Sequence, residues 1–135
     1  MKYEISLEEI MKKIRLKIYD EKYDFVVSIN RGGLLPGYLI SKYLSVPLEQ
    51  ITLNLRDENH KKIRDIPLLL KKINFSVKNK NILLVDDIVN SSTTMNFAKK
   101  LLEEANSIKT VVIFGNADIS LFGVHNECII WPWER

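Results

Sequence analysis

The sequence predicts an α/β fold, a doubly wound and mostly parallel sheet flanked by helices. Two observations support this prediction. Short apolar runs rich in branched residues alternate along the chain with segments in which apolar residues recur at helical spacing. Two of these runs, 25–29 and 82–85, change at once into polar or glycine-rich residues and then into a helical pattern. That order is typical of βαβ units, whose strands are covered on both faces and therefore lack polar alternation.

A capping box predicts the first helix. Ser6 is followed three residues later by Glu9, and the two side chains can satisfy free backbone N–H groups at a helix start. Apolar residues then fall on one helical stripe, which we expect to pack on the sheet without a chemical role. The stripe consists of Leu7, Ile10, Met11, Ile14 and Ile18.

The later elements are predicted from apolar runs separated by turns. We expect strands at 23–29, 46–55, 66–70, 82–85, 110–114 and 127–131, and helices at 35–44 and 92–105. The sequence contains no repeat, low-complexity tract or linker, and 135 residues are enough for one domain with a substantial core. A single domain is therefore expected over residues 1–135.

The composition is that of a soluble globular protein, with 46% hydrophobic and 27% charged residues. The net charge of +3 is too small to argue for a nucleic-acid partner by itself. Cys128 is the only cysteine, so no internal disulfide is possible, and its apolar surroundings favour packing over catalysis. No stretch approaches 18 apolar residues and the N-terminus lacks an apolar signal core. We therefore expect a cytoplasmic protein without a membrane partner.

The most informative motif follows the apolar run 82–85. Asp86 and Asp87 come directly after it, at the strand end where open α/β sheets bind ligands. Four hydroxyl residues, 91–94, then open a helical pattern, and a helix N-terminus of this kind binds anions, most often phosphate. Together they indicate a ligand with sugar hydroxyls and phosphates, and with a divalent metal. A response-regulator receiver domain is excluded because only 48 residues follow Asp87, whereas a surface turn without function stays open.

A glycine-rich motif follows the apolar run 25–29. Arg31 supplies a fixed cation, and Gly32 and Gly33 lack Cβ atoms, so a pyrophosphate can approach the backbone closely. An ordinary turn is the alternative. The position of this motif after a strand, about fifty residues before the acidic pair, favours the pyrophosphate interpretation.

The C-terminal motif places Trp131 and Trp133 on either side of Pro132. In one interpretation Trp131 closes the core and Trp133 is a terminal plug. In the other, a tryptophan stacks on a flat heterocycle, a contact worth roughly 1–3 kcal/mol per base in nucleic-acid binders.

These motifs resemble those of the type I phosphoribosyltransferases. In that family an apolar strand leads to two acidic residues, two apolar residues and Asp-Thr-Gly-x-Thr. The glycine motif resembles the family's pyrophosphate loop, in particular the Arg-Gly-Gly-Leu-x-Pro-Gly run of the bacterial xanthine-guanine (6-oxopurine) type, which also has a Pro-Trp near its base pocket. The resemblance extends from about Tyr23 to Glu134.

The resemblance implies a purine phosphoribosyltransferase that uses 5-phosphoribosyl-1-pyrophosphate (PRPP) as its Mg²⁺ complex. It assigns the ribose hydroxyls and the metal to Asp86 and Asp87, and the leaving pyrophosphate to Arg31, Gly32 and Gly33. The 5′-phosphate is assigned to the loop Asn90, Ser91, Ser92, Thr93 and Thr94, and the purine to Trp133 and Ile88 on its two faces. Some family members hold a non-proline cis peptide in the pyrophosphate loop, so one is expected at Asn30-Arg31 or Arg31-Gly32.

Three residues depart from the family pattern. Asn90 replaces the acid that exchanges a proton with the purine, and general acid–base catalysis is typically worth about 100- to 10,000-fold in rate. Ser92 replaces the glycine of the loop, so the backbone there must suit a residue with a side chain. Asn116 occupies the position of a lysine that contacts the purine 6-oxo group, and an amide can either donate or accept a hydrogen bond. The choice between a 6-oxo and a 6-amino base therefore stays open.

Residues 56–64 form a polar, mixed-charge connection between two predicted strands. A solvated loop is the first interpretation. In the family this region is a flexible flap that closes over PRPP and excludes water from a reactive ribose centre. The basic residues that would then reach the pyrophosphate are Arg56, Lys61, Lys62 and Arg64.

Two functions therefore remain on the basis of the sequence. The first is purine salvage, with transfer of phosphoribosyl from Mg-PRPP to guanine, xanthine or hypoxanthine. The alternative is a catalytically weak or inactive regulatory protein that binds PRPP or a nucleotide, which the departures at Asn90, Ser92 and Asn116 favour. The resemblance also implies a homo-oligomer, a dimer or tetramer.

Overall fold

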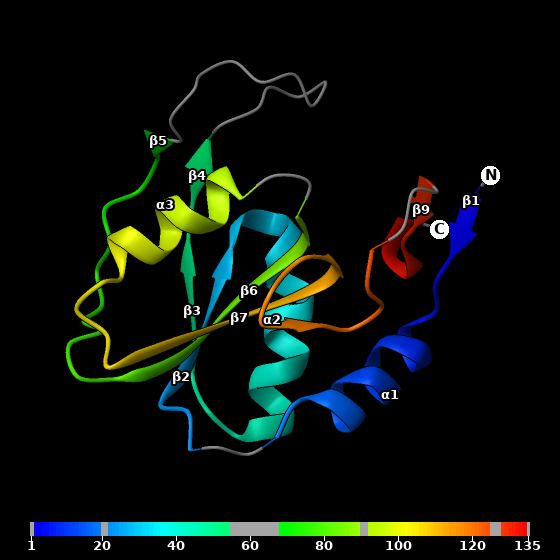
Figure 1. The fold of residues 1–135 in the computed structure, drawn as a ribbon, viewed down its shortest axis with the longest axis horizontal. Helices are drawn as coiled ribbons and strands as arrows, with labels where there is room; N and C mark the ends of the chain where they lie inside the picture. The colour runs from blue at the N-terminus through cyan, green and yellow to red at the C-terminus, as the bar shows by residue number, and fades with distance from the viewer. Residues whose placement is uncertain (1, 20–21, 55–67, 90–91, 125–127, 135) are drawn as a thin grey trace.

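The computed structural model describes residues 2–19, 22–54, 68–89, 92–124 and 128–134. Its centre is a five-stranded sheet in which every neighbouring pair is parallel, as the sequence predicts. The strand order across the sheet is β3 (Leu48–Ile51), β2 (Phe25–Ile29), β6 (Asn81–Val89), β7 (Ser107–Gly115) and β8 (Ile119–Ser120). Figure 1 shows this sheet between helices.

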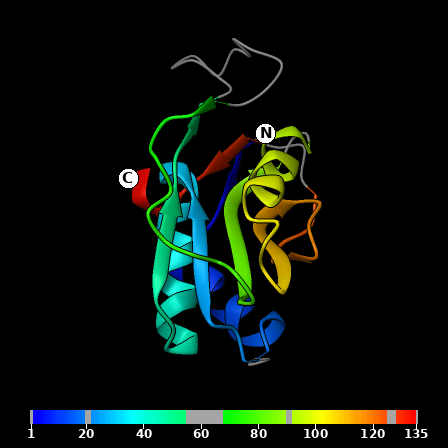
Figure 2. The ribbon, with the colours of Figure 1, turned by 90° about the vertical axis from the view of Figure 1, so that its left-hand side faces the viewer.

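The helices cover both faces of the sheet, and the strand residues alternate between two apolar clusters. α1 (Leu7–Lys17) and α2 (Asn30–Leu44) pack on one face, where Val26, Leu83 and Val85 point. α3 (Thr93–Leu101) packs on the other, against the intervening strand residues of the same β2 and β6. Figure 2 shows the two helical layers on either side of the strands. Both faces are buried, which explains why the strands read as continuous apolar runs.

The capping box is confirmed at the start of α1. The Glu9 backbone N–H donates to Ser6 Oγ at 3.1 Å, and the Ser6 backbone N–H donates to Glu9 Oε1 at 3.1 Å. Ile10 and Ile14 of the predicted stripe are completely buried, whereas Leu7 remains 43% exposed. The helix packs against the sheet as expected.

Several predicted boundaries were wrong. α2 begins at Asn30 rather than near residue 35, so the glycine motif is the first turn of the helix itself. The predicted strand 46–55 is divided into β3 and β4 (Leu53–Asn54), and β4 pairs antiparallel with β5 (Leu68–Leu69). β6 continues to residue 89 and contains both aspartates, because its pairing with β7 continues past the apolar run. α3 ends at Leu101, four residues earlier than predicted.

A third sheet, made of two strands, was not predicted. β1 (Lys2–Glu4) pairs in parallel with β9 (Cys128–Ile130), and the two lie side by side away from the central sheet (Figure 1). β1 is only three residues long, so periodicity alone could not reveal it. This pairing holds the C-terminal tryptophan segment, including the 3₁₀ turn Pro132–Glu134, at one end of the molecule.

Candidate active site

The acidic and glycine motifs lie at the point where the winding of the sheet reverses. From β2 the chain crosses to β3 on one side, and from β6 it crosses to β7 on the other, while β2 and β6 are direct neighbours. Ligands of open α/β sheets bind outside the carboxyl ends of the strands at such a switch point. The residues that follow β2 and those that end β6 are the two predicted motifs.

The two motifs are in direct contact. A Cβ atom at Gly32 would lie 2.5 Å from Asp87 Oδ2, and one at Gly33 would collide with the Val85 carbonyl oxygen. Gly33 is therefore required for close packing of the first turn of α2 on β6, and a side chain at Gly32 would displace the Asp87 carboxylate. The acidic pair and the glycine turn, which are about fifty residues apart in sequence, form one site.

The carboxylates of the acidic pair are held by the backbone that follows them. Asp86 Oδ1 accepts the Asp87 backbone N–H at 2.9 Å, and Asp87 Oδ1 accepts the Ile88 backbone N–H at 2.8 Å. Burial raises the pKa of Asp86 well above the ordinary value of an aspartate, and the adjacent charge of Asp87 raises it further. A ligand that brings positive charge, such as a metal ion, would therefore stabilise the ionised form of both carboxylates.

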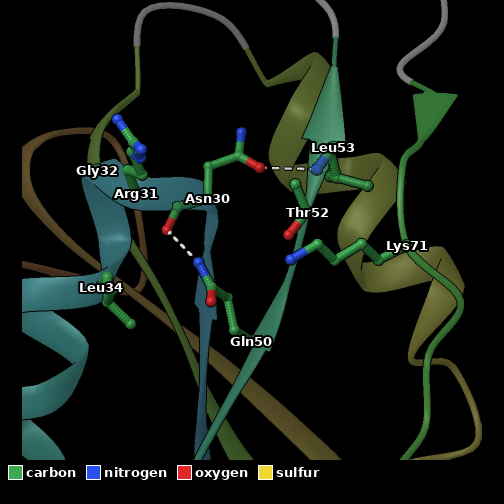
Figure 3. A pocket seen from close by; sticks show the side chains of 8 residues that line it. All are labelled: Asn30, Arg31, Gly32, Leu34, Gln50, Thr52, Leu53 and Lys71. Atoms are coloured by element: carbon green, nitrogen blue, oxygen red, sulfur yellow. Dashed lines mark hydrogen bonds between the residues drawn. The ribbon is translucent and has the colours of Figure 1, made fainter.

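Asn30 fixes the start of the glycine turn and was missed by the sequence analysis. It has a φ of 55°, which asparagine tolerates better than most residues. Its Oδ1 accepts the Leu53 backbone N–H at 2.7 Å, and its carbonyl oxygen accepts from Gln50 Nε2 at 3.1 Å (Figure 3). The described residues contain no cis peptide bond, so the cis peptide expected beside Arg31 is absent.

A pocket of about 540 Å³ opens beside this turn. It is lined by residues from the first turn of α2, from β3 and β4, and from the segment after β5. They are Asn30, Arg31, Gly32, Leu34, Gln50, Thr52, Leu53 and Lys71, as Figure 3 shows. The predicted residues Arg31 and Gly32 thus face a cavity large enough for a small ligand.

The predicted 5′-phosphate loop leads into α3. Ser92 precedes the helix with φ −78° and ψ −1°, a conformation that any residue adopts, so a serine is accommodated without strain where the family has glycine. Its side chain makes no capping hydrogen bond, and it is exposed. Thr93 and Thr94 form the first turn and are half-buried, whereas Asn90 and Ser91 lie outside the described residues. The site therefore includes a helix N-terminus of the kind that binds phosphate.

Trp133 is the outer member of an aromatic stack. Its ring lies parallel to that of Trp131, with centroids 5.0 Å apart and an interplanar angle of 9°, and Trp131 in turn contacts Phe114 edge-on at 5.9 Å. Trp133 is 41% exposed. It lines an apolar pocket of about 460 Å³ together with Arg31, Leu34, Leu35, Tyr38 and Leu48. Arg31 therefore borders both pockets, the polar one and the one that contains Trp133.

Comparison with known sequences identifies the family. The sequence model of the phosphoribosyl transferase domain matches residues 1–121 of this chain. The chain belongs to that family.

Proteins similar to this chain carry names from purine metabolism. The chain is 25% identical over 108 residues to the xanthine-guanine phosphoribosyltransferase of Idiomarina loihiensis, covering 77% of this chain and 66% of that protein. It is 27% identical over 144 aligned positions to the hypoxanthine-guanine phosphoribosyltransferase of Lactococcus lactis, covering 93% and 78%. The chain thus spans just under two thirds of the length of the first relative.

A solved structure shows the same fold. The purine phosphoribosyltransferase of Pyrococcus horikoshii superimposes with a TM-score of 0.83 and covers 99% of this chain and 95% of its own, at 21% identity. The predicted fold class of a type I phosphoribosyltransferase is therefore confirmed.

Of the remaining predicted residues, the structure describes Ile88 and Asn116. Asn116 is exposed and follows Gly115, whose φ of 116° brings it against the Val89 backbone at the end of β6. Ile88 is half-buried and packs on the Phe114 side of the core. Neither Ile88 nor Asn116 lines the pocket of Trp133.

The predicted flap residues Arg56, Lys61, Lys62 and Arg64 lie outside the described residues. Within the described ranges, no three His, Cys, Asp or Glu side chains form a group able to hold a metal ion. No helix in those ranges has the length and apolar character needed to cross a bilayer.

Proposed function

We propose that this phosphoribosyltransferase transfers the phosphoribosyl group of Mg-PRPP to a purine base and releases pyrophosphate and a nucleoside monophosphate. The contact between Gly32 and Asp87 carries the proposal, because it brings a backbone suited to pyrophosphate against a carboxylate suited to ribose hydroxyls. In PRPP the pyrophosphate is bonded to C1 of the ribose, so the residues that bind the two groups must be neighbours. Gly32 and Asp87 are such neighbours. The names of both relatives and of the Pyrococcus horikoshii structure support a purine as acceptor.

Each motif takes one part of PRPP in this proposal. Arg31 and the backbone of Gly32 and Gly33 bind the pyrophosphate, and Asp86 and Asp87 orient the ribose hydroxyls. The 5′-phosphate binds at the N-terminus of α3, where the Ser92 side chain makes no capping hydrogen bond and the start of the helix favours an anion. The helix begins directly after the loop that leaves β6, so ribose and 5′-phosphate contacts come from one segment.

The acidic pair fits a magnesium ion that is bound together with the substrate. Mg²⁺ in phosphoryl substrates usually takes one or two carboxylates, phosphate oxygens and retained water, rather than a cage of protein ligands. Two adjacent carboxylates without a third acidic or histidine ligand among the described residues match that pattern. The metal would neutralise charge on the pyrophosphate and on Asp86 and Asp87.

The reaction is a substitution at C1 of the ribose. A ring nitrogen of the base forms a bond to C1, the bond between C1 and the pyrophosphate oxygen breaks, and pyrophosphate leaves with that electron pair. The base loses its N–H proton to solvent or to the departing pyrophosphate, because Asn90 is an amide and cannot accept it. Catalysis therefore rests on positioning and on stabilising the charge that develops on the pyrophosphate.

The base is proposed to stack on the exposed face of Trp133, beside Arg31. The face of this ring that is not covered by Trp131 is available, and the pocket it lines is apolar. Asn116 and Ile88 do not line this pocket, so no contact with the base is proposed for them. We also propose that the protein works in the cytoplasm as a homo-oligomer, on the basis of the family resemblance.

Pyrophosphate release from Mg-PRPP with hypoxanthine, guanine, xanthine or adenine, one base at a time, tests the proposal. Release with one or more of the four establishes the enzyme and assigns the base. Silence with every base, from a folded sample that still binds PRPP, would favour the alternative of a regulatory PRPP-binding protein. The departures from the family pattern at Asn90, Ser92 and Asn116 are the features that favour that alternative.

A further inference from the structure

Lys71 lines the pocket beside the glycine turn, although it lies outside the predicted flap. The pocket is bordered by Arg31 on one side and Lys71 on the other, with Gln50 and Thr52 between them. Figure 3 shows the Lys71 side chain extending from the chain after β5 toward Gln50 and Thr52. The pocket thus has one cation from each of two separate segments.

The position of Lys71 is determined by backbone pairing. β4 and β5 pair antiparallel, with Leu53 opposite Leu69, and the Leu70 backbone N–H donates to the Thr52 carbonyl oxygen at 2.8 Å. Lys71 follows directly. The same β3–β4 segment is tied to the glycine turn, because Leu53 N–H donates to Asn30 Oδ1. A short series of hydrogen bonds therefore connects the backbone that carries Lys71 with the backbone that carries Arg31.

The charges of the two cations are not balanced within the pocket. Among the described residues, no carboxylate lines this pocket; Glu49 lines a neighbouring pocket, which shares Lys71, Gln50 and Thr52 with it. With the other described residues, neither the Arg31 nor the Lys71 side chain forms a hydrogen bond or an ion pair. Two cations that face one cavity repel each other unless an anion lies between them. The charge pattern therefore selects a multiply charged anion.

We propose that Lys71 is a second pyrophosphate-binding cation, which binds the anion from the side opposite Arg31 and the glycine turn. The identity of the anion rests on the proposed function, because pyrophosphate is the group that PRPP presents to this turn. Lys71 touches the leaving group in this arrangement and stabilises its charge as it departs. Gln50 serves a different purpose, since its amide already donates to the Asn30 carbonyl oxygen.

The test measures binding of inorganic pyrophosphate in the presence of Mg²⁺ by isothermal titration calorimetry. Lys71→Met removes the charge but keeps an apolar stem, and we expect binding to weaken about tenfold or more, the typical value of one charge-assisted contact. Lys71→Arg keeps the charge and is expected to stay within about threefold of the parent. Because the side chain is exposed, the variants should fold, which circular dichroism can verify.

Lys72→Met is the matched control. Lys72 is the next residue and is also exposed, but it does not line the pocket of Arg31. We expect it to bind pyrophosphate like the parent. Equal binding by Lys71→Met and the parent would overturn the proposal, and so would equal weakening by Lys71→Met and Lys72→Met, which indicates a general charge effect. A parent protein that does not bind pyrophosphate would overturn it too.

The outcome for the proposed function is separate. Absence of pyrophosphate release with all four bases, together with pyrophosphate binding that depends on Lys71, would reject purine transfer and retain Lys71 as an anion ligand. Purine transfer, together with unchanged pyrophosphate binding in Lys71→Met, would support the proposed function and reject Lys71 as a pyrophosphate ligand.

Discussion

The two halves of the candidate site are built in different ways. The half that we propose binds PRPP, which we call the PRPP half, contains the glycine turn and the acidic pair and lies on the switch point of the central sheet. There Gly32 and Gly33 pack closely against residues of β6. The base half is formed by Trp131 and Trp133, which are attached through the small β1–β9 sheet and packed by aromatic stacking. In the first half, Gly33 meets the backbone of β6 and Gly32 meets the Asp87 carboxylate, whereas the second half is held by contacts between side chains.

This difference has a consequence for how each half tolerates change. Backbone contacts in a packed α/β core leave little room for adjustment, so a small addition displaces the groups that bind the ligand. Trp133 is 41% exposed, so its replacement should cost only the free energy of its stacking contact. PRPP chemistry should therefore be the less adaptable half, and base preference the more adaptable.

The largest effect is expected for Gly32→Ala. Its Cβ would meet Asp87 Oδ2 at 2.5 Å and displace either the carboxylate or the turn. A displacement of about 1 Å at a reacting centre can cost roughly 100-fold, and we expect a loss of that order in kcat/KM for PRPP. Steady-state kinetics at saturating base measures it.

Gly123→Ala is the control for that loss. Gly123 has a φ of 77°, so alanine is strained there, yet no atom of the described residues lies within 4 Å of the Cβ that alanine would add. This variant should lower the Tm and leave kcat/KM unchanged. If both glycine variants lose activity in proportion to their loss of Tm, the contact with Asp87 has no specific role.

A smaller and more selective effect is expected for Trp133→Ala. Loss of one stacking contact, roughly 1–3 kcal/mol, should raise the KM for the base about tenfold while pyrophosphate binding stays unchanged. Trp131→Ala should instead destabilise the fold by about 2 kcal/mol, because this ring contacts Phe114 in the core. The comparison between the halves is wrong if Trp133→Ala weakens pyrophosphate as strongly as it weakens the base.

Asn90→Asp tests whether the PRPP half has lost a catalytic group. Restoring a carboxylate that can take the proton of the purine should raise kcat, by up to about 100-fold if proton transfer limits the rate, or leave it unchanged if it does not. Asn90→Ala is the control, because it removes the amide without adding a base. A clear fall in kcat for Asn90→Asp would show that the asparagine is adapted to its substrate.

The sequence alone was enough to place most residues of the half that we propose binds PRPP, and their roles there stay predictions. Asp86, Asp87, Gly32 and Gly33 were predicted because their types change abruptly at the ends of apolar strands, which is a local signal. The parallel direction of the strands followed from the alternation of strands and helices. Such features depend on residues that are close in sequence, and a single chain displays them.

The sequence was not sufficient where position depends on distant pairing. Asn30 and Lys71 were missed, because their roles arise from the Leu53 hydrogen bond and from the β4–β5 pairing. β1 was missed because three residues give no periodicity, and its partner is more than a hundred residues away. The stack of Trp133 on Trp131 also depends on how the chain turns at Pro132, which composition does not specify.

The smallest effect concerns stability and follows from the raised pKa of Asp86. The folded protein holds the Asp86 proton more tightly than the unfolded chain, so the favourable contribution of the protonated carboxyl is present at low pH and lost as pH rises through the raised pKa. Above it, the ionised carboxylate is desolvated and repelled by Asp87, which destabilises the fold. Asp86→Asn removes that cost and should raise the Tm at pH 8 by a few degrees, since 1 kcal/mol is worth about 4 °C in a domain of this size.

At pH 4 the same substitution should change the Tm little, because the Asp86 carboxyl is protonated in the folded protein. Thermal unfolding of the variant and the parent at the two pH values measures the difference. Mg-PRPP should stabilise the parent more than Asp86→Asn, because the variant lacks one carboxylate for the metal and the ribose. An equal Tm gain at pH 4 and pH 8 would mean that Asp86 is not ionised at a cost in the folded protein. If Asp86→Asn raises the Tm of the free protein at pH 8 but reduces the Tm gain caused by Mg-PRPP, the Asp86 carboxylate lowers stability and contributes to ligand binding.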